Sequence, residues 1–459
     1  MTTTTAATPV KTGFGLKARH IHFIALGSAI GTGLFYGSAG AIQAAGPSVL
    51  LVYLLGGAVV YFLLRALGEM SVHSPVTGSF AEYARRYLGN WTGYITGWMY
   101  AFEMMIVCLA DLTAIGIYMK LWFPTTPQWV WVAVTLLIVG AANLASARWF
   151  GELEFGMTVI KVAAVVAMII GGALILIFNL GSSPEHIGVD NLWNDGGFMP
   201  NGIGGMVSAF ILVLFAFGGT EIIGVTASEA ESPEKSIPKA VNTVPVRILV
   251  FYVLAIFVIV AINPWRSITG DESPFVQIFS TLGVNWAAGL LNVVVISAAL
   301  SAINSDLFGA GRVITGMAKQ NHAPAFMAKM SRGVPVMTVV TLLLVMVVGV
   351  VLNYFIPESI FESIAALATF ATIFVWLMIL LAHVAFRRSI GSEASTLKFP
   401  VPLWPLGQYF AIAFILFTFG IMVWQPDFHM ALWAGLAFTV LMTVIFYLSG
   451  THKKNYEQV

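Results

Sequence analysis

Apolar runs of roughly 20 residues, long enough to cross the hydrocarbon core of a bilayer, recur along the whole chain. Only 9% of its residues are charged, whereas a soluble domain usually carries roughly 25%. A chain in lipid must satisfy its backbone polar groups internally, and a helix does so along its length. The sequence therefore predicts an all-α polytopic membrane protein.

We expect twelve spans, with a polar N-terminal tail at 1–17 and a second tail at 450–459. The N-terminal tail lacks the apolar core of a cleavable signal peptide. The expected spans lie near residues 18–43, 47–70, 91–121, 128–146, 153–180, 203–225, 239–263, 284–314, 336–354, 359–386, 403–424 and 429–449.

The distribution of basic residues predicts the orientation. If the N-terminus is cytoplasmic, all but three of the 22 Lys and Arg residues lie on the cytoplasmic side. The exceptions are Lys120 and Arg266 in outer loops and Lys161 within a span. Because cytoplasmic loops carry the excess of positive charge, we expect both termini in the cytoplasm.

Two of the expected spans are interrupted by glycine. The first contains GSAIGTGLFYGSAG (27–40), in which five of fourteen residues are glycine, and the sixth contains FGGTE (217–221). Glycine weakens a helix interior by about 1 kcal/mol relative to alanine. If the first ten spans form two repeats of five, spans one and six occupy the same position in their repeats. A pair of glycine-interrupted spans at equivalent positions points to the binding site of a transporter.

Unwound helices free backbone groups that can hold both ends of a zwitterion. Amides near Thr32 and Gly33 suit a carboxylate, and carbonyls near the two breaks suit an ammonium. The alternative is that the glycines, such as Gly27 and Gly31, only allow close helix packing. The expected backbone contacts of a substrate are Ala29, Ile30, Thr32, Gly33, Phe215, Ala216 and Gly218.

Ionisable residues at membrane depth cost from about 2.5 kcal/mol upward, so each is a functional candidate. The sequence has five of them, Glu103, Asp111, Lys161, Glu221 and Asp306. A buried lysine such as Lys161 can lose and regain a proton. The alternative is a permanently charged strut that binds carbonyl oxygens.

Several long motifs resemble the amino acid permeases of the APC (amino acid–polyamine–organocation) superfamily. They are GSAIGTGLFYGSAGAIQAAGPSVLLVYLLGG, RALGEMSVHSPVTGSFAEYARRYLG, FAFGGTEIIGVTASEAESPEKSIPKAV, SAINSDLFGAGR and LATFATIFVWLMILLAHVAFRR. The resemblance implies a five-plus-five inverted repeat of the leucine-transporter type, with helices 1 and 6 broken. The repeats would be 18–180 and 203–386, followed by two extra helices in 403–449.

The resemblance also implies roles for individual residues. Lys161 would take the place of a sodium ion and reach the backbone near Gly27 to Ile30. Glu221 would bridge the sixth span to its neighbours and take part in proton transfer, or else form structural hydrogen bonds only. Phe215 would close over the bound substrate as a gate, unless it is ordinary packing.

The substrate side chain is the least constrained part of this prediction. The bacterial amino acid transporter branch includes histidine and proline permeases, which this chain resembles at Gly218 and over the stretch GWMYAFEMMIVCLADLTAIGIYM. Many other members of that branch have Gln at the position of Gly218. Alignment places Glu103 beside the substrate side chain, where a carboxylate can accept a hydrogen bond from an imidazole but not from a proline ring. This favours histidine, unless Glu103 pairs with a neighbouring helix instead.

The remaining features exclude several other functions. We expect Asp111 and Asp306 to be structural and to pair with loop arginines such as Arg312. The single cysteine, Cys108, excludes an internal disulfide, and the eight histidines form no metal-binding constellation. No phosphate loop or catalytic triad is present, so we expect no enzymatic activity and no cofactor. The net charge of +1 gives no indication of nucleic-acid binding.

The sequence as a whole predicts a proton-coupled amino acid importer, a symporter of the bacterial inner membrane. Histidine is the favoured substrate, protons are the coupling ion, and the lipid bilayer is the surrounding partner. A proline permease of the same branch and an amino acid exchanger are the alternatives. The sequence makes no prediction of an oligomeric state.

Overall fold

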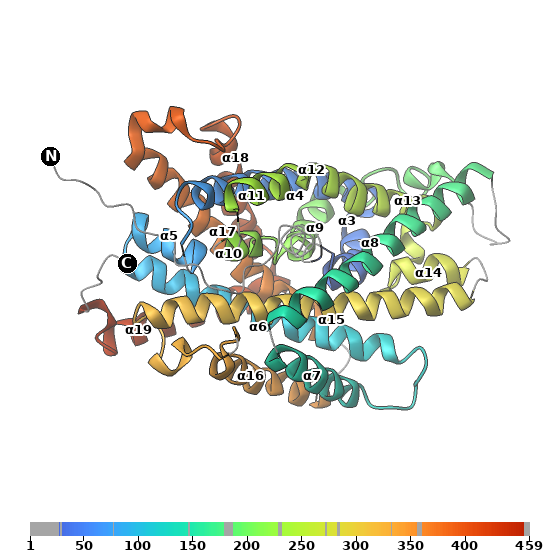
Figure 1. The fold of residues 1–459 in the computed structure, drawn as a ribbon. Coiled ribbons are helices and arrows are strands. Elements are labelled where there is room, and N and C mark those ends of the chain that lie inside the picture. Colours follow the sequence, from blue (N-terminus) through green and yellow to red (C-terminus); the bar gives the residue numbers. More distant parts are fainter. Residues whose placement is uncertain are drawn as a thin grey trace.

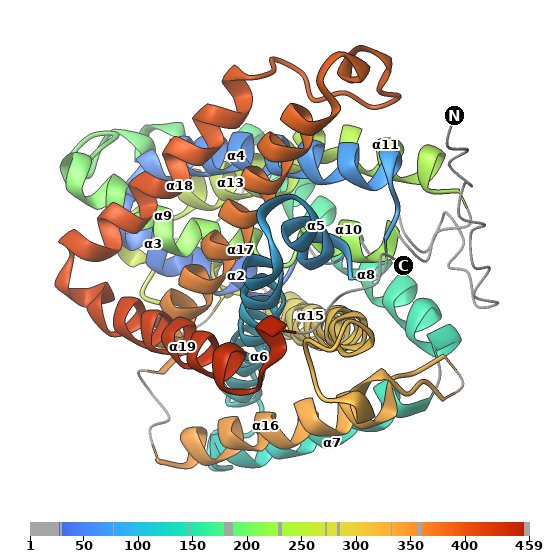
Figure 2. The same ribbon diagram turned by 90° about the vertical axis from the view of Figure 1, so that its left-hand side faces the viewer.

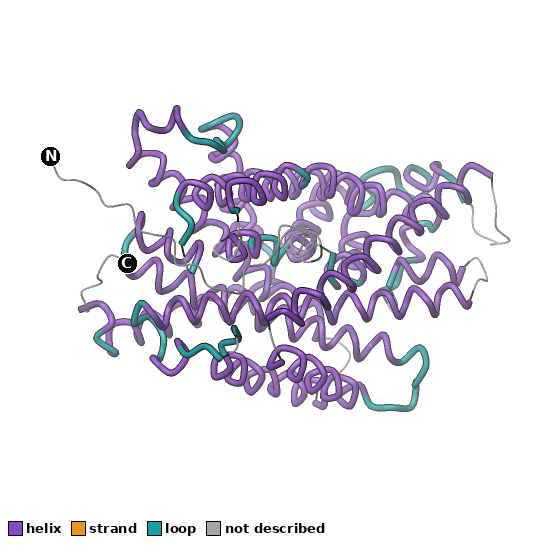
Figure 3. Tube along the Cα trace, viewed as in Figure 1, coloured by secondary structure: helices purple, strands orange, loops and turns teal. Residues whose placement is uncertain are grey.

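The computed structural model describes residue 27 and residues 30–76, 78–145, 147–178, 187–227, 232–270, 273–281, 285–331, 333–355 and 360–453. These residues form helices and connecting loops (Figure 3). Among them no β-strand is present beyond one isolated bridge between Ser331 and Val334. The predicted all-α class is confirmed.

The N-terminal half of the described chain begins with two short helices and continues with longer ones. Its α-helices are α2 (Thr32–Phe35), α3 (Gly37–Ala45), α4 (Val49–His73), α5 (Ser79–Leu88), α6 (Asn90–Met119), α7 (Gln128–Ala145) and α8 (Ala147–Phe178).

The C-terminal half again contains a divided helix, α9 and α10, and a run that is π-helical over Ile248–Leu254 (η3). Its α-helices are α9 (Gly202–Phe217), α10 (Ile222–Ala227), α11 (Pro233–Asn242), α12 (Val244–Arg247), α13 (Ala255–Ile262), α14 (Pro274–Thr281), α15 (Asn285–Lys319), α16 (Val336–Phe355), α17 (Ile360–Ile390), α18 (Leu406–Trp424) and α19 (His429–Leu448).

Ten helices or continuous helical runs among the described residues are long and apolar enough to cross a membrane, and α7 is a shorter apolar helix. Each expected span from 47–70 onward overlaps a helix or helical run. The first expected span, 18–43, lies partly outside the described residues.

The helices form a bundle around α6 (Figure 1). α6 packs against α5, α15 and α17, while α9 packs against α3, α4 and α17. α7 and α16 lie side by side along one edge, as both ribbon views show (Figures 1 and 2). The interior is thus shared by both halves of the chain.

The outer faces of peripheral helices are apolar. Ile177 on α8 is 73% exposed, Leu344 on α16 is 66% exposed and Leu448 on α19 is 83% exposed. An extended apolar surface marks a face that contacts another apolar medium. Together with the length of the helices, this surface fits a lipid environment.

Candidate functional site

The first glycine-rich stretch contains the helix break that its composition predicts. The amide of Ile30 donates a hydrogen bond to the Gly27 carbonyl at 3.1 Å. Gly31 is extended, with φ −121° and ψ −165°, and α2 begins at Thr32. Ile30 and Thr32 are buried, whereas Ala29 lies outside the described residues. The break therefore lies inside the protein.

The second break divides α9 from α10, again as predicted. α9 ends at Phe217, and Gly218 leaves the helical region with φ −55° and ψ 151°. Gly219 has φ +82°, a left-handed conformation that glycine adopts without the steric cost of a β-carbon. Helical structure resumes at Ile222. The pair of glycines in FGGTE thus forms the turn between two half-helices.

The two breaks are in direct contact. A β-carbon on Gly33 would lie 2.5 Å from the Cα atom of Ala216, and one on Gly37 would lie 3.7 Å from the Phe215 ring. α2 also packs against α6 and α15. Glycine at position 33 is what allows the backbones of α2 and α9 to approach this closely.

Two of the carbonyls expected to bind an ammonium already accept hydrogen bonds. The Phe215 carbonyl accepts the amide of Gly218 at 3.0 Å. The Ala216 carbonyl accepts the hydroxyl of Tyr252, in the π-helical stretch, at 3.1 Å. Each carbonyl oxygen has two lone pairs, so both keep capacity for another donor.

Two carboxyl groups, those of Glu103 on α6 and Glu221 at the second break, lie beside α17. The Thr372 hydroxyl donates to Glu103 Oε1 at 2.6 Å, and the Trp376 indole N–H donates to Glu221 Oε2 at 3.1 Å. Thr372 and Trp376 are four residues apart and share one face of α17. The helix thus presents two donors, one for each carboxyl group.

The same two carboxyl groups contact each other. Oε2 of Glu103 and Oε1 of Glu221 are buried and meet no N–H or O–H donor among the described residues. A hydrogen bond between two carboxyl groups requires a proton on one of them. The pair is therefore suited to hold a proton.

Gly218 leaves room for this pair. A β-carbon at that position would lie 3.3 Å from Thr372 Oγ1 and 3.8 Å from Glu103 Oε1. A longer side chain would therefore run into the Thr372–Glu103 hydrogen bond. The structure accordingly shows Glu103 packed against a neighbouring helix, and a contact with the substrate side chain stays a prediction.

Asp111 occupies a different place from the one we expected. Its Oδ1 accepts a hydrogen bond from the Thr32 hydroxyl at the start of α2. The expected pairing of Asp111 with a loop arginine is wrong, because its position on α6 directs it to the broken helix. Asp306 on α15 is also buried, and its pairing with a loop arginine stays a prediction.

Lys161 reaches the first broken helix. It is fully buried on α8, and its ammonium donates to the Gly27 carbonyl at 2.7 Å. This is the contact that the resemblance implied. The position of the ammonium beside the break is therefore established, and its titration stays a prediction.

Sequence reasoning missed Glu154, which is also fully buried on α8. Its Oε1 accepts the Ser301 hydroxyl at 2.6 Å. The expected span 153–180 begins one residue before Glu154, so the hydropathy pattern did not mark it as a buried ionisable residue. The signal that could have found it is the spacing of Glu154, Thr158 and Lys161, which places all three on one helix face.

Phe215 belongs to an aromatic cluster beside the breaks. Its ring makes an edge-to-face contact with Phe361 at the start of α17, with centroids 5.9 Å apart. Phe361 makes a second such contact with Tyr36, at 4.6 Å. The cluster connects both broken helices to α17, so movement of any one of them changes these contacts.

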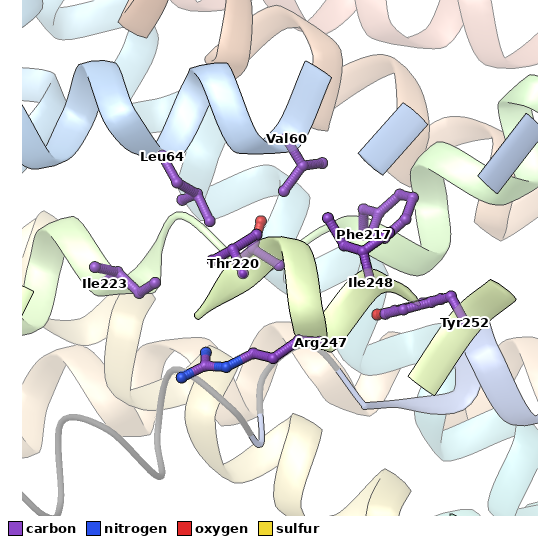
Figure 4. Close-up of a pocket in the computed structure, with 9 residues that line it drawn as sticks. Val60, Leu64, Phe217, Thr220, Ile223, Arg247, Ile248 and Tyr252 are labelled. Atoms are coloured by element: carbon purple, nitrogen blue, oxygen red, sulfur yellow. The ribbon is translucent and has the colours of Figure 1, made fainter. Parts of the chain in front are cut away.

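A small cavity lies beside the second break, and Figure 4 shows the residues that line it. The volume of this cavity is about 20 Å³, which is enough for about one water molecule and too small for an amino acid. Thr220, Arg247 and Tyr252 provide polar groups in an otherwise apolar lining. The cavity lies between α4, the second break and the stretch from α12 to η3.

Among the residues that the structure describes, no group of three or more His, Cys, Asp or Glu side chains is arranged to hold a metal ion. The charged interior groups described above are carboxyl groups, Lys161 and Arg247.

The chain is similar to known transport proteins over nearly its whole length. A family model described as amino acid permease matches residues 20–457. The uncharacterized amino acid permease YtnA of Bacillus subtilis (strain 168) is 43% identical over 443 residues, 96% of each chain. The aromatic amino acid transport protein AroP of Escherichia coli (strain K12) is 45% identical over 413 residues, 90% of each chain.

The probable threonine/serine transporter YbxG of Bacillus subtilis (strain 168) is 42% identical over 441 residues, 96% of each chain. The printed functions of these relatives concern aromatic amino acids and threonine or serine, so closeness to histidine and proline permeases stays a prediction. The relatives are transporters and not enzymes. The matched family model and these relatives show that the chain is a membrane transporter that belongs to the amino acid permease family.

Proposed function

We propose that this permease imports an amino acid together with protons, by alternating access around the two helix breaks. The observation that carries the proposal is the backbone contact between the breaks at Gly33 and Ala216. Broken helices in contact at the centre of a bundle are the arrangement in which transporters bind substrates. Two buried ionisable groups contact the first broken segment, because Asp111 bonds Thr32 and Lys161 bonds Gly27.

The proposed membrane arrangement has twelve spans in the bacterial inner membrane, with both termini in the cytoplasm. The first ten spans would form two inverted repeats of five, followed by two further helices. The concentration of basic residues in the loops assigned to the cytoplasm supports this orientation.

The backbone at the breaks would hold the charged ends of the substrate. The α-carboxylate would bind amides near Thr32 and Gly33, at the positive end of the half-helices that follow. The α-ammonium would bind carbonyls near Ala29 and Ile30 and those of residues 215–218. The capacity that the Phe215 and Ala216 carbonyls retain supports this assignment.

The substrate side chain would be read by Glu103, and histidine is the substrate that we propose. A buried carboxylate favours a substrate that donates a hydrogen bond, because an apolar ring would leave the carboxylate unpaired. The second candidate is a larger aromatic amino acid, which the similarity to an aromatic amino acid transporter favours. An indole N–H would satisfy the same carboxylate.

Lys161 and Glu221 would carry the protons. Lys161 contacts the first break through Gly27, and Glu221 follows the second break and contacts Glu103. Protonation of either group would thus change contacts at a break. This link between charge and backbone geometry is what proton-driven transport requires.

The test is uptake of labelled histidine into proteoliposomes that hold no substrate and experience an inward proton gradient. We expect accumulation that a protonophore abolishes and that excess unlabelled proline does not reduce. Excess phenylalanine and tryptophan test the aromatic alternative. Uptake that requires preloaded amino acid would instead identify an exchanger, and inhibition by proline would contradict the role of Glu103.

A further inference from the structure

A second buried carboxylate lies on the same helix face as Lys161. Glu154, Thr158 and Lys161 follow one another at helical spacing on α8, and all three are 0% exposed. Glu152 and Gly156, on the other faces of the same turns, are exposed. A fully buried carboxylate needs partners, because its desolvation is costly.

Neutral donors surround the carboxylate of Glu154. Its Oε1 accepts the Ser301 hydroxyl at 2.6 Å and the Thr158 hydroxyl at 3.4 Å. Its Oε2 accepts the amide of Asn304 at 3.5 Å, and the Asn304 carbonyl oxygen accepts the amide of Asn143 at 3.0 Å. These donors come from α7, α8 and α15 and accommodate the ionised form of the carboxylate.

Gly27 connects Glu154 with Lys161. The Gly27 carbonyl accepts the lysine ammonium at 2.7 Å. A β-carbon on Gly27 would lie 2.7 Å from Glu154 Oε1 and 2.2 Å from Thr158 Oγ1. The first helix break therefore lies against both charged groups, and a displacement of the break changes the surroundings of both.

Glu154 is nearer than Lys161 to the N-terminal end of α8. Lys161 lies seven positions further along the helix, which corresponds to about 10 Å at 1.5 Å per residue. In the proposed orientation this end of α8 faces the cytoplasm. The titratable groups whose charges act on Lys161 are Glu154 on its own helix, Asp111 on α6 and Asp306 on α15.

We propose that Glu154 accepts the transported proton from Lys161 and releases it to the cytoplasm. An N–H bond of the ammonium breaks and an O–H bond forms on the Thr158 hydroxyl, whose own proton passes to Glu154 Oε1 along their hydrogen bond. An amine, an intact hydroxyl and a carboxylic acid result. The carboxylic acid then gives its proton to cytoplasmic water and becomes a carboxylate again. This inference rests on the proposed proton coupling and adds the exit side of the path.

The test compares two transport modes of Glu154→Gln in proteoliposomes. Labelled histidine, phenylalanine, threonine and proline are supplied in turn, and those that the wild type accumulates are used. Net uptake driven by a proton gradient requires release of the proton inside, whereas exchange against preloaded substrate does not. Glu152→Gln is the matched control, because it removes an exposed carboxylate two residues away.

In Glu154→Gln we expect the rate of gradient-driven uptake to fall at least tenfold below that of the wild type. The rate of exchange should stay within twofold of the wild type. Glu154→Asp, which keeps the carboxylate, and Glu152→Gln should retain both modes. Undiminished gradient-driven uptake in Glu154→Gln would overturn this inference alone. Equal loss of both modes would make Glu154 a structural residue and also overturn it. A wild type without gradient-driven uptake would refute the proposed coupling itself.

Discussion

A β-carbon on Gly33 would lie 2.5 Å from the Cα atom of Ala216, so the two helix breaks meet backbone to backbone. Gly33 belongs to α2 and Ala216 to α9, on opposite halves of the chain. No flexible side chain separates them, so a relative movement of the two half-helices is transmitted directly.

Gly33→Ala should disrupt this contact. Overpacking a close backbone approach typically costs about 1–3 kcal/mol, so we expect a lower unfolding temperature in detergent and at least a tenfold loss of uptake. Gly171→Ala is the control, because a β-carbon at Gly171 on α8 would meet no atom within 4 Å. If Gly33→Ala has the unfolding temperature and the uptake of the wild type, the two breaks can move apart at little cost in free energy.

Thr372→Val should impair transport because it removes the donor to Glu103 Oε1. A buried acceptor without a donor costs about 1–3 kcal/mol, so we expect uptake to fall while Thr372→Ser retains it. The control is Thr341→Val, whose exposed hydroxyl bonds only the carbonyl of Met337 in its own helix. If the valine and serine variants transport equally well, the hydrogen bond has no functional role.

Phe361→Ala should weaken closure of the aromatic cluster. The edge-to-face contacts of Phe361 with Phe215 and Tyr36 are each worth about 0.5–1.5 kcal/mol beyond their buried area. If substrate binding loses the equivalent of one of these contacts, KM for the transported amino acid should rise about two- to tenfold. Phe178→Ala, which truncates a 64% exposed ring, should leave KM unchanged. An unchanged KM in Phe361→Ala would argue against a gate formed by these rings.

Glu69→Gln should destabilise the fold through a buried ionic network. The carboxylate of Glu69 on α4 contacts His383 Nε2 at 3.1 Å and Arg387 Nε at 2.5 Å, both on α17. It also accepts the amide of Val401 at 2.5 Å. Removing one partner of a buried pair costs about 3–5 kcal/mol, because the other charge stays buried.

The control for Glu69 is an exposed ion pair. Glu234 and Lys398 lie 2.8 Å apart, with side chains 58% and 69% exposed, and such pairs contribute about 0–1 kcal/mol. We therefore expect the unfolding temperature of Glu69→Gln to be clearly lower than that of Glu234→Gln. Similar unfolding temperatures for both variants would mean that the Glu69 network contributes little to stability.

The helix breaks could be predicted because their causes are local. Glycine weakens a helix wherever it stands, and the left-handed φ of Gly219 requires a residue without a β-carbon. The contact of Lys161 with the first break was also anticipated, through a resemblance of the surrounding motifs. The breaks themselves do not depend on the exact rotation of one helix against another.

The partners of buried charges were harder to predict. Asp111 bonds Thr32 on the broken helix, where we expected a loop arginine, and Glu154 is fully buried where we expected the edge of a span. The Glu69 network also escaped notice, because its members lie on separate helices far apart in the sequence. A hydropathy pattern gives the depth of a residue only to within several positions.

The sequence by itself determined the helical class, most of the spans and the positions of both breaks, since hydropathy and the helix cost of glycine act within one segment. Only the tertiary structure decided that Gly33 meets Ala216, that Thr372 and Trp376 hold two carboxyl groups together, and that Glu154 lies beside Gly27. Such contacts depend on how each helix is rotated and how deeply it sits. A shift of one residue turns a helix by about 100°, and no local pattern constrains rotation that closely.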